Sequence, residues 1–437
     1  MHASHRPRAP FRRPGSLPKL PLSLLLVIVL AAIISVVTLA FRWPRLFPAD
    51  QRAQHAGAGA FEAAPFEQSD PVAYKRTLCE KDMLKSREAL QLLRLTPETI
   101  SARNRRQRLS PHRYPRVFCF VNTISVNKDR AQAVANTWGQ RCDKLVFFSN
   151  ETDTIYVGKD TAREQAFDVV FIDVIADHDH LWQKHKASLQ YVYDNYRHDY
   201  DWFYKADDDA YVVVENLRDY LARPEIVMNY HRQPMQMGHR FNLTAQLVDY
   251  YVVDTELKSK WNQRFDRWVF NSGGPGYVMN RLYLDKIISI LPDKSCLSDD
   301  MSEMLPDDAS ISYCMMWYGV FPWDTRDSMG RERWHADNPK GVYHTRYHEK
   351  DPEYWYNQYH RNIGGVRTGD ECCAPDSIGF HYVKPQLMYH MERVLYFCRA
   401  GPEVVDMVKF NDKYGLAVSN DIMVFDPPKW EPIDDEL

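Results

Sequence analysis

The sequence has no strong excess of charge of either sign, because its formal net charge at neutral pH is only −3. So small a charge disfavours a protein that is drawn to nucleic acid by its overall electrostatics. The sequence also has no cysteine pair at C-x-x-C spacing, which disfavours a cysteine-held metal. It shows no internal repeat over its 437 residues, a length that allows one large domain or two ordinary ones, plus anchors and linkers.

Charge is absent from the first apolar run, which extends from Leu20 to Phe41. About 20 apolar residues are enough to cross a bilayer as a helix. Residues 1–19 contain lysine and arginine but no acidic residue, so we expect a cytoplasmic tail at 1–19 and a single-pass type II signal-anchor at 20–41. The alternative is a cleaved signal peptide, whose apolar core is normally shorter, at about 7–15 residues.

Three weaker features agree with a lumenal position for the rest of the chain. The eight cysteines all follow the apolar run, and an even number suits disulfides, although buried free thiols are the alternative. Two sequons, at Asn150 and Asn242, would be exposed to N-glycosylation in the lumen, but such triplets also arise by chance. The last four residues, Asp-Asp-Glu-Leu, resemble an ER retrieval signal except at the first position, and a plain acidic terminus is the alternative.

The chain divides by composition into a stem at 42–110, a catalytic domain at 111–400 and a C-terminal tail at 401–437. Within the domain, predicted helices at 129–140 and 181–195 alternate with short β-rich runs, namely VFCFVNTI, KLVFFSN, DVVFIDV and the two runs that flank the acidic turn of DWFYKADDDAYVVV. Strands that alternate with helices predict an α/β domain with a largely parallel sheet. Ligands of such sheets bind at the carboxyl ends of the strands.

Three consecutive carboxylates, Asp207, Asp208 and Asp209, follow the apolar run Trp202–Tyr204. Adjacent carboxylates repel one another, so the cluster is costly unless a cation or positive side chains compensate for it. At the end of a strand it forms an oxygen-rich site that suits Mn²⁺ or Mg²⁺, and such a metal bridges the two phosphates of a nucleotide sugar. A solvated acidic turn is the alternative.

Three further motifs carry candidate chemistry. Asp307 and Asp308 precede a predicted helix, where they would act as a catalytic base or would only favour the helix N-terminus. Gly273 and Gly274, in SGGPGYV, would let the backbone approach a ligand closely, with a plain turn as the alternative. His381, in GFHYV, is a candidate metal ligand, although a lone histidine in an apolar run is more often a core residue.

From Val117 to Cys398 the chain resembles the core 1 β1,3-galactosyltransferases, within the wider β1,3-glycosyltransferase family that includes the fringe enzymes. The matching stretches are NTWGQRCDK, LWQKHKASLQYVYDNY, DWFYKADDDAYVVVENLR, SGGPGYV, WDTRDSMGRERWH, ECC and FHYV. The resemblance implies a GT-A type nucleotide-sugar transferase domain with a Rossmann-like mixed sheet, and Mn²⁺ as cofactor. It implies inverting transfer from UDP-galactose to GalNAc α-linked to Ser or Thr of glycoproteins, a Golgi membrane location and a homodimer.

Carried over residue by residue, the resemblance assigns roles to the acidic groups. Asp207 and Asp209 fall on the metal-binding motif, with Asp208 beside them at the nucleotide sugar, and His381 falls on the histidine partner of the metal. Asp308 falls on the catalytic base, with Asp307 as its neighbour.

The remaining assignments concern the substrates and the disulfides. Thr123 ends the first strand, where the family holds the uridine, and Gly273 and Gly274 are assigned to the nucleotide sugar. Trp355 lies in an aromatic-rich stretch that suits stacking on the acceptor sugar. Four disulfides are expected, and the family spacing suggests two of them, Cys119 with Cys142 and Cys296 with Cys314. Pairing Cys79 with Cys398 would then leave the adjacent Cys372 and Cys373, a guess that the family spacing does not supply.

The chain departs from the core 1 pattern at two places that bear on the acceptor. Asp307 stands where the core 1 enzymes usually carry glutamate, and Asn242–Phe270 has the character of an insertion. A β1,3-transferase with another donor or acceptor is therefore one alternative. A non-catalytic lumenal chaperone is the alternative from another class, although the chaperone relative of this family lacks the acidic metal motif.

Overall fold

The computed structural model describes residues 115–157, 165–175, 177, 180–243, 255–293, 296 and 306–398, together with Arg76 and Cys79. All of them belong to the second of two compact units, which spans Ser69–Leu437. The predicted signal-anchor at 20–41, the C-terminal tail, its retrieval-like end and the stem apart from Arg76 and Cys79 lie outside the described residues. No helix within the described part of the chain is long and apolar enough to cross a membrane.

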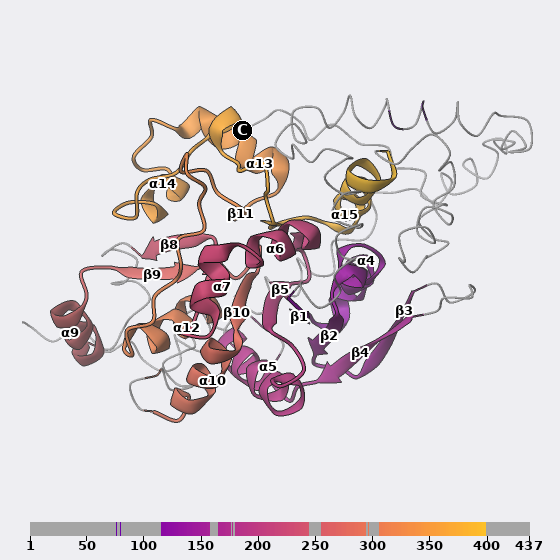
Figure 1. Cartoon of the computed structure of the whole chain (residues 1–437), viewed down its shortest axis with the longest axis horizontal. Coiled ribbons are helices and arrows are strands. Elements are labelled where there is room, and N and C mark those ends of the chain that lie inside the picture. Colours follow the sequence, from indigo (N-terminus) through magenta and orange to yellow (C-terminus); the bar gives the residue numbers. More distant parts are fainter. Residues whose placement is uncertain are drawn as a thin grey trace, which may run out of the picture. The chain divides into compact units, whose positions relative to one another are not determined.

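A seven-stranded mixed sheet forms the centre of the described chain, in the order β3-β4-β2-β1-β5-β10-β7 (Figure 1). The strands β4, β2, β1 and β5 are parallel, β3 is antiparallel to β4, and β10 lies antiparallel between β5 and β7. The predicted α/β class with a parallel centre is therefore confirmed. The strand bounds are Val117–Asn122 (β1), Lys144–Ser149 (β2), Asp153–Val157 (β3), Gln165–Phe171 (β4), Trp202–Asp207 (β5), Gln236–Gly238 (β7) and Tyr277–Asn280 (β10).

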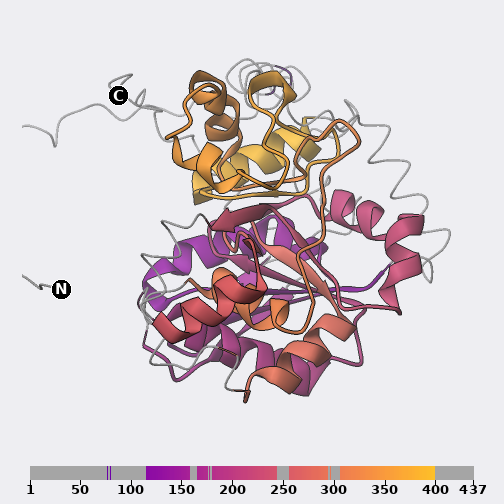
Figure 2. The ribbon, with the colours of Figure 1, turned by 90° about the vertical axis from the view of Figure 1, so that its left-hand side faces the viewer.

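Helices cover both faces of this sheet. The side chains of the central strand β1 point alternately into two apolar clusters, one on each face. Phe118 and Phe120 of β1 pack in the cluster that also holds residues of α5 (Leu181–Tyr196), α10 (Arg281–Ile290) and α12 (Asp307–Met316). The intervening residues of β1 pack with α4, α6 and α15 on the other face, whose bounds are Lys128–Asn136, Val214–Leu221 and Pro385–Glu392. Figures 1 and 2 show these three layers.

Two smaller sheets extend this core. The first has the order β11-β12-β6, and the second pairs β8 with β9. The predicted strand YVVV is shorter than expected, because only Tyr211–Val212 form β6 and α6 begins at Val214. The remaining bounds are Pro224–Tyr230 (α7), Arg240–Leu243 (β8), Thr255–Arg264 (α9), Trp268–Asn271 (β9), Trp334–His335 (β11), Pro339–His344 (α13), Trp355–Tyr359 (α14) and Gly379–Phe380 (β12).

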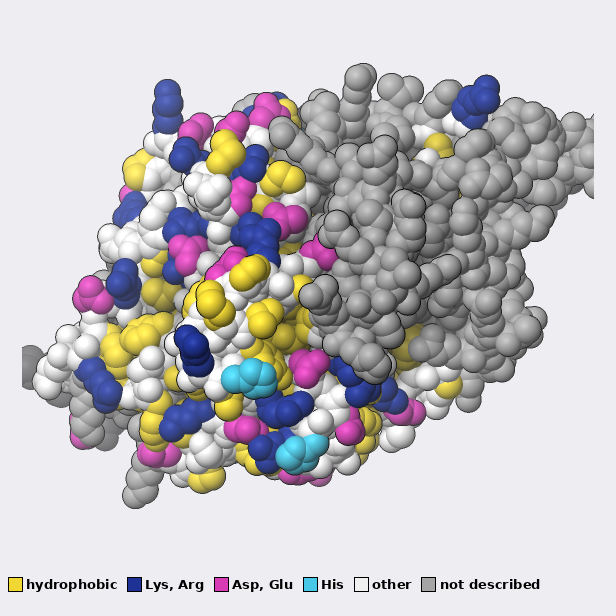
Figure 3. All heavy atoms as spheres, in the orientation of Figure 1, with side chains coloured by type: hydrophobic (Ala, Val, Ile, Leu, Met, Phe, Trp, Pro, Cys, Tyr) yellow, Lys and Arg dark blue, Asp and Glu magenta, His cyan; other side chains and the backbone are white. Residues whose placement is uncertain are grey.

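All eight cysteines are paired in disulfides, and none is free. The pairs are Cys79–Cys398, Cys119–Cys142, Cys296–Cys314 and Cys372–Cys373, the four that the sequence and its resemblance suggested. Outside the core, acidic and basic side chains are interspersed over the described part of the face in Figure 3. This mixture agrees with the small net charge of the chain.

Candidate active site

The carboxyl ends of β1 and β5 bring the first predicted site residues together. The two strands are parallel neighbours whose register pairs Asn122 with Asp207, so the residues that follow meet at one edge of the sheet. There the Thr123 hydroxyl donates to Asp208 Oδ2 at 2.7 Å, and Asn127 Nδ2 donates to the same oxygen at 3.1 Å. Asp208 is buried and is held by these protein donors.

His381 reaches the acidic turn through the three-stranded sheet. Strand β12 ends one residue before His381 and pairs antiparallel with β6, which begins two residues after Asp209. The pairing places His381 Nε2 3.4 Å from Asp209 Oδ1. The residue that follows, Tyr382, stacks on the imidazole with 3.8 Å between ring centroids and has a positive φ of 50°. Backbone strain of this kind clusters at functional sites.

The donor set at this turn fits a manganese ion. Neighbouring ligands on one divalent ion, with bonds of about 2.1–2.2 Å, lie about 3 Å apart, close to the Asp209–His381 separation. Burial raises the pKa of Asp207 to about 6, with Lys205 opposing the shift. Although burial opposes it, His381 and Arg130 keep the pKa of Asp209 below its usual value. A cation beside Asp207 and Asp209 would stabilise both carboxylates in the charged form.

The Ser-Gly-Gly turn after β9 connects this turn to the second acidic pair. The Gly273 amide donates to Asp308 Oδ2 at 2.7 Å. A Cβ atom on Gly273 would lie 3.0 Å from Lys205 Nζ, and one on Gly274 would lie 2.2 Å from the ring of His381. The two glycines therefore allow the close approach that the sequence predicted, and the groups that approach here are the candidate base and the candidate metal ligand.

The two acidic residues at the start of α12 have different surroundings. Asp307 is buried, and its Oδ2 lies 3.1 Å from Lys205 Nζ. Although burial opposes it, the Lys205 and His185 charges keep the pKa of Asp307 below its usual value. Asp308 is less buried, and burial followed by the Asp307 charge raises its pKa to about 7. A carboxyl group that titrates near neutral pH is suited to accept a proton.

Three basic residues at the site were not identified from the sequence. Lys205 is buried inside β5, and its Nζ lies 2.8 Å from Asp207 Oδ1 and 3.1 Å from Asp307 Oδ2, so it links the two acidic groups. Arg130 Nη1 lies 3.3 Å from Asp208 Oδ1, and Lys184 donates to the Thr123 carbonyl. The period of two along a strand, which places residues 205 and 207 on one face, was the available signal for Lys205.

Trp355 begins α14 and remains 42% exposed. Its ring centroid lies 5.2 Å from that of Tyr356 and 6.2 Å from that of Phe241. An exposed indole held by aromatic neighbours has the form that stacking on a sugar requires. Its assignment to the acceptor stays a prediction.

The two sequons differ in the structure. Asn242 is a buried residue of β8, and its Nδ2 donates to the Arg361 carbonyl at 3.1 Å. This burial disfavours a glycan at Asn242 in the folded chain, because the amide that would carry it faces the interior. Asn150 follows β2 and is partly exposed, so a glycan there stays a prediction.

Comparison with known proteins gives three findings. Residues 114–324 match the family model described as Fringe-like, a stretch that contains both acidic groups and ends before His381. Glycoprotein-N-acetylgalactosamine 3-beta-galactosyltransferase 1 of Xenopus laevis is 29% identical over 287 residues, which are 65% of this chain and 67% of that protein. A solved structure of the galactosyltransferase LgtC with donor and acceptor sugar analogues covers 69% of this chain and 96% of its own, at 12% identity and a TM-score of 0.30. So low a TM-score carries no argument about this chain.

Proposed function

With a Fringe-like region and a galactosyltransferase relative, this chain is a glycosyltransferase, and we propose that it transfers galactose from UDP-galactose to GalNAc α-linked to Ser or Thr of glycoproteins. The name of the Xenopus relative supports this donor sugar and acceptor. The proposal includes a catalytic domain of the GT-A type and inversion at the anomeric carbon.

The observation that carries this proposal is the connection between the base and the metal ligands. Gly273 holds Asp308, the adjacent Gly274 packs on His381, and His381 approaches Asp209. A proton acceptor and a set of metal ligands are therefore fixed to one short turn. A base that takes the hydroxyl proton and a cation that stabilises the leaving diphosphate would together promote displacement of a diphosphate by a hydroxyl group.

On the donor side, Asp207, Asp209 and His381 would hold Mn²⁺, which supplies positive charge to stabilise the departing UDP. Arg130 lies 3.3 Å from Asp208 and 3.5 Å from Asp209, so its guanidinium adds positive charge at the same edge of the sheet. The buried hydrogen bond between Thr123 and Asp208 fixes the ends of β1 and β5 against each other. We assign Thr123, Asp208, Gly273 and Gly274 to the nucleotide-sugar side of the site.

On the acceptor side, Asp308 takes the proton of the attacking hydroxyl. The Gly273 amide orients Oδ2, and the Ala309 amide donates to Oδ1 at 2.7 Å. The charge of Asp307 raises the proton affinity of Asp308, while Lys205 keeps Asp307 itself ionised. The deprotonated oxygen then attacks the anomeric carbon on the face opposite UDP, which inverts its configuration.

The test is an assay of the purified chain with a GalNAc-peptide and a panel of UDP-sugars. We expect transfer from UDP-galactose that a chelator removes and that added Mn²⁺ restores. Transfer from another UDP-sugar, or to another acceptor, would instead indicate a different β1,3-transferase. If no UDP-sugar is transferred or hydrolysed with Mn²⁺ present, the non-catalytic lumenal chaperone becomes the better interpretation.

We propose the Golgi membrane as the location and a homodimer as the assembly. The charge-free run at 20–41 and the four disulfides support a lumenal catalytic domain. Protease protection of sealed microsomes tests the topology, and light scattering of the purified chain tests the dimer. Digestion of the catalytic domain in intact vesicles would contradict the lumenal position.

A further inference from the structure

Three ionisable side chains lie together in the interior, apart from the acidic residues and His381 of the candidate active site. They are His239, between β7 and β8, Glu332, two residues before β11, and His360, which directly follows α14. Their exposed fractions are 0%, 4% and 2%. One ligand atom from each lies within 4.8 Å of those of the other two. Ionisable groups so deeply buried require partners that satisfy them.

The hydrogen bonds of the two histidines define where their lone pairs point. His239 Nδ1 lies 2.6 Å from the Trp334 carbonyl oxygen, and His360 Nδ1 lies 2.6 Å from the Tyr356 carbonyl oxygen. A carbonyl oxygen only accepts, so both Nδ1 atoms carry the proton. A neutral imidazole has one N–H group, which leaves Nε2 of each ring as a bare acceptor.

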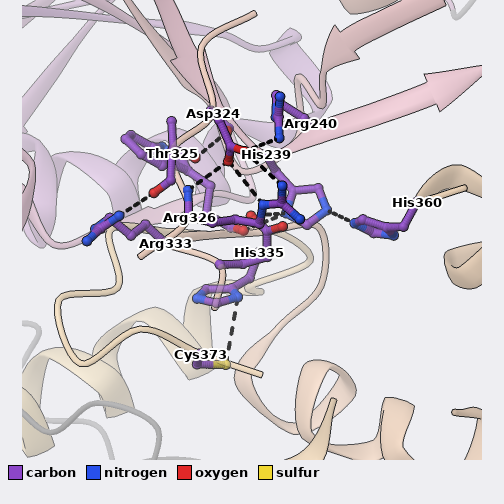
Figure 4. A network of polar contacts seen from close by, with 12 residues as sticks. His239, Arg240, Asp324, Thr325, Arg326, Arg333, His335, His360 and Cys373 are labelled. Carbon is purple, nitrogen blue, oxygen red and sulfur yellow. Dashed lines mark hydrogen bonds and ion pairs between the residues drawn. The ribbon is translucent and has the colours of Figure 1, made fainter. Parts of the chain in front are cut away.

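These two bare nitrogen atoms face each other. His239 Nε2 and His360 Nε2 are 3.1 Å apart, the contact drawn as a dashed line in Figure 4. Both rings are buried, and burial disfavours the second proton that would make either imidazole charged. Two lone pairs at this distance with no proton between them repel, and a cation that both nitrogens bind would remove the repulsion.

The separation of the nitrogens matches that of two ligands on one zinc ion. With Zn–N bonds of about 2.0–2.1 Å and tetrahedral angles, neighbouring ligand atoms lie about 3.3 Å apart. The observed 3.1 Å is close to this value without any movement of the rings. Glu332 Oε2 lies 3.7 Å from His239 Nδ1, on the protonated side of that ring, so the carboxylate must move to reach an ion between the two Nε2 atoms. Backbone carbonyls that accept from Nδ1 are the usual support of histidine ligands.

We propose that His239, Glu332 and His360 form a structural zinc site, separate from the manganese site at the acidic turn. Two imidazoles and one carboxylate are a set of protein ligands that zinc takes, with water in the fourth position, and burial of all three residues excludes substrate from this site.

Two arginines near the triad oppose a bound cation, and a carboxylate offsets part of their charge. The guanidinium groups of Arg240 and Arg326 are positive neighbours of Glu332, but both pair with Asp324, at 2.6 Å and 2.8 Å. Figure 4 shows these two arginines converging on Asp324 next to His239. A zinc ion would supply positive charge beside the buried Glu332 carboxylate.

The site would fasten two parts of the chain that serve the two substrates. His360 directly follows the helix that begins with Trp355, the predicted acceptor residue. The His239 carbonyl accepts from the Ser272 amide at 2.8 Å, immediately before the Gly273 that holds the candidate base. A zinc ion shared by His239 and His360 therefore fixes the aromatic helix against the Ser-Gly-Gly turn.

The experiment is zinc analysis of the full chain carrying Asp209→Ala, a change that disables the predicted manganese site. The protein is loaded with Zn²⁺, dialysed against metal-free buffer and analysed by inductively coupled plasma mass spectrometry. We expect about one zinc per chain, and less than about a tenth of that when Glu332→Gln and His360→Asn are added. His335→Asn is the matched control, because His335 is equally buried but its Nε2 contacts Ser377. It should retain the zinc.

A second measurement does not depend on the folding of the triad variants. Loading the Asp209→Ala chain with Co²⁺ in place of Zn²⁺ should give the visible absorption of a tetrahedral ion with imidazole ligands. Absence of both retained zinc and this absorption would overturn the proposal and leave a shared proton between the histidines. Retention of zinc by the folded triple variant would also overturn it. Neither outcome depends on galactose transfer, so failure here is distinct from failure of the proposed function.

Discussion

Replacing Asp308 by asparagine tests the assignment of the base most directly. Asparagine keeps the size of the side chain and one oxygen that accepts from the Gly273 or the Ala309 amide, but its NH2 group cannot accept from the other amide and it cannot take the acceptor proton. General-base catalysis contributes a factor of roughly 10²–10⁴, so kcat should fall by that factor, or about 2.7–5.5 kcal/mol of transition-state stabilisation. The KM for UDP-galactose should change little, since the donor is assigned to the other acidic group.

The same substitution should leave the fold intact. It removes one of two adjacent carboxylates whose mutual repulsion raises the pKa of Asp308, and asparagine also tolerates the first turn of a helix. We expect the free energy of unfolding to fall by about 1–3 kcal/mol, because one of the two backbone amides that donate to Asp308 loses its acceptor. Stability is measured by chemical denaturation, and kcat is measured with saturating GalNAc-peptide and Mn²⁺. A near-parental kcat in the folded variant would refute the assignment, and an inactive Asp307→Asn beside it would identify Asp307 as the base.

The pH profile provides a second check on Asp308. A base acts when deprotonated, so kcat should be highest above its pKa of about 7 and should fall as the pH decreases through that value. At pH 6 about one-tenth of the carboxyl groups would be ionised. Asp307→Asn removes the neighbouring negative charge, so the acidic limb of the profile should move to lower pH while Lys205 stays protonated. An acidic limb that Asp307→Asn leaves in place would contradict this coupling.

Three further substitutions test other parts of the structure. Gly274→Ala should abolish metal-dependent transfer, because the added Cβ would lie 2.2 Å from the ring of His381. Titration of the variant with Mn²⁺ measures the loss, and an unchanged affinity for Mn²⁺ would contradict the packing of Gly274 on His381. Lys205→Met should lower the free energy of unfolding by about 3–5 kcal/mol, because it leaves buried carboxylates without their shared cation. A chemical denaturation curve like that of the parent would refute the role of Lys205 as the cation that these carboxylates share. Asn242→Gln should leave the glycan mass unchanged whereas Asn150→Gln removes one glycan, and mass spectrometry of the secreted domain distinguishes the two sites.

The sequence predicted those parts of the site that depend on the ends of secondary-structure elements. The acidic turn lies at the end of β5 and the second acidic pair begins α12, because apolar runs ending in carboxylates mark such boundaries directly. The pairing of β12 with β6, which brings His381 to Asp209, joins residues far apart in the chain through strands of two residues each. Strands of two residues are too short to show an alternation of apolar and polar residues in the sequence.

Burial of polar residues was the harder part to predict. Lys205 lies in the interior because two carboxylates offset its desolvation, and those partners are visible only after the sheet is assembled. Asn242 has a sequon that predicts exposure, yet β8 and the Arg361 carbonyl enclose its amide. His239 and His360 are 121 residues apart, so their contact depends on the tertiary fold alone. The family resemblance, in contrast, was visible from motifs and is confirmed by the comparisons.

The disulfide between Cys79 and Cys398 joins residues 319 positions apart and thereby closes the catalytic chain into a covalent ring. A single proteolytic cut inside a ring opens it without releasing either piece. Release of the intact enzyme from its predicted anchor therefore requires proteolytic cleavage before Cys79, in the part of the chain that lies outside the ring. Secretory proteases would thus either shed the whole catalytic domain or nick it into fragments that stay joined until the disulfide is reduced.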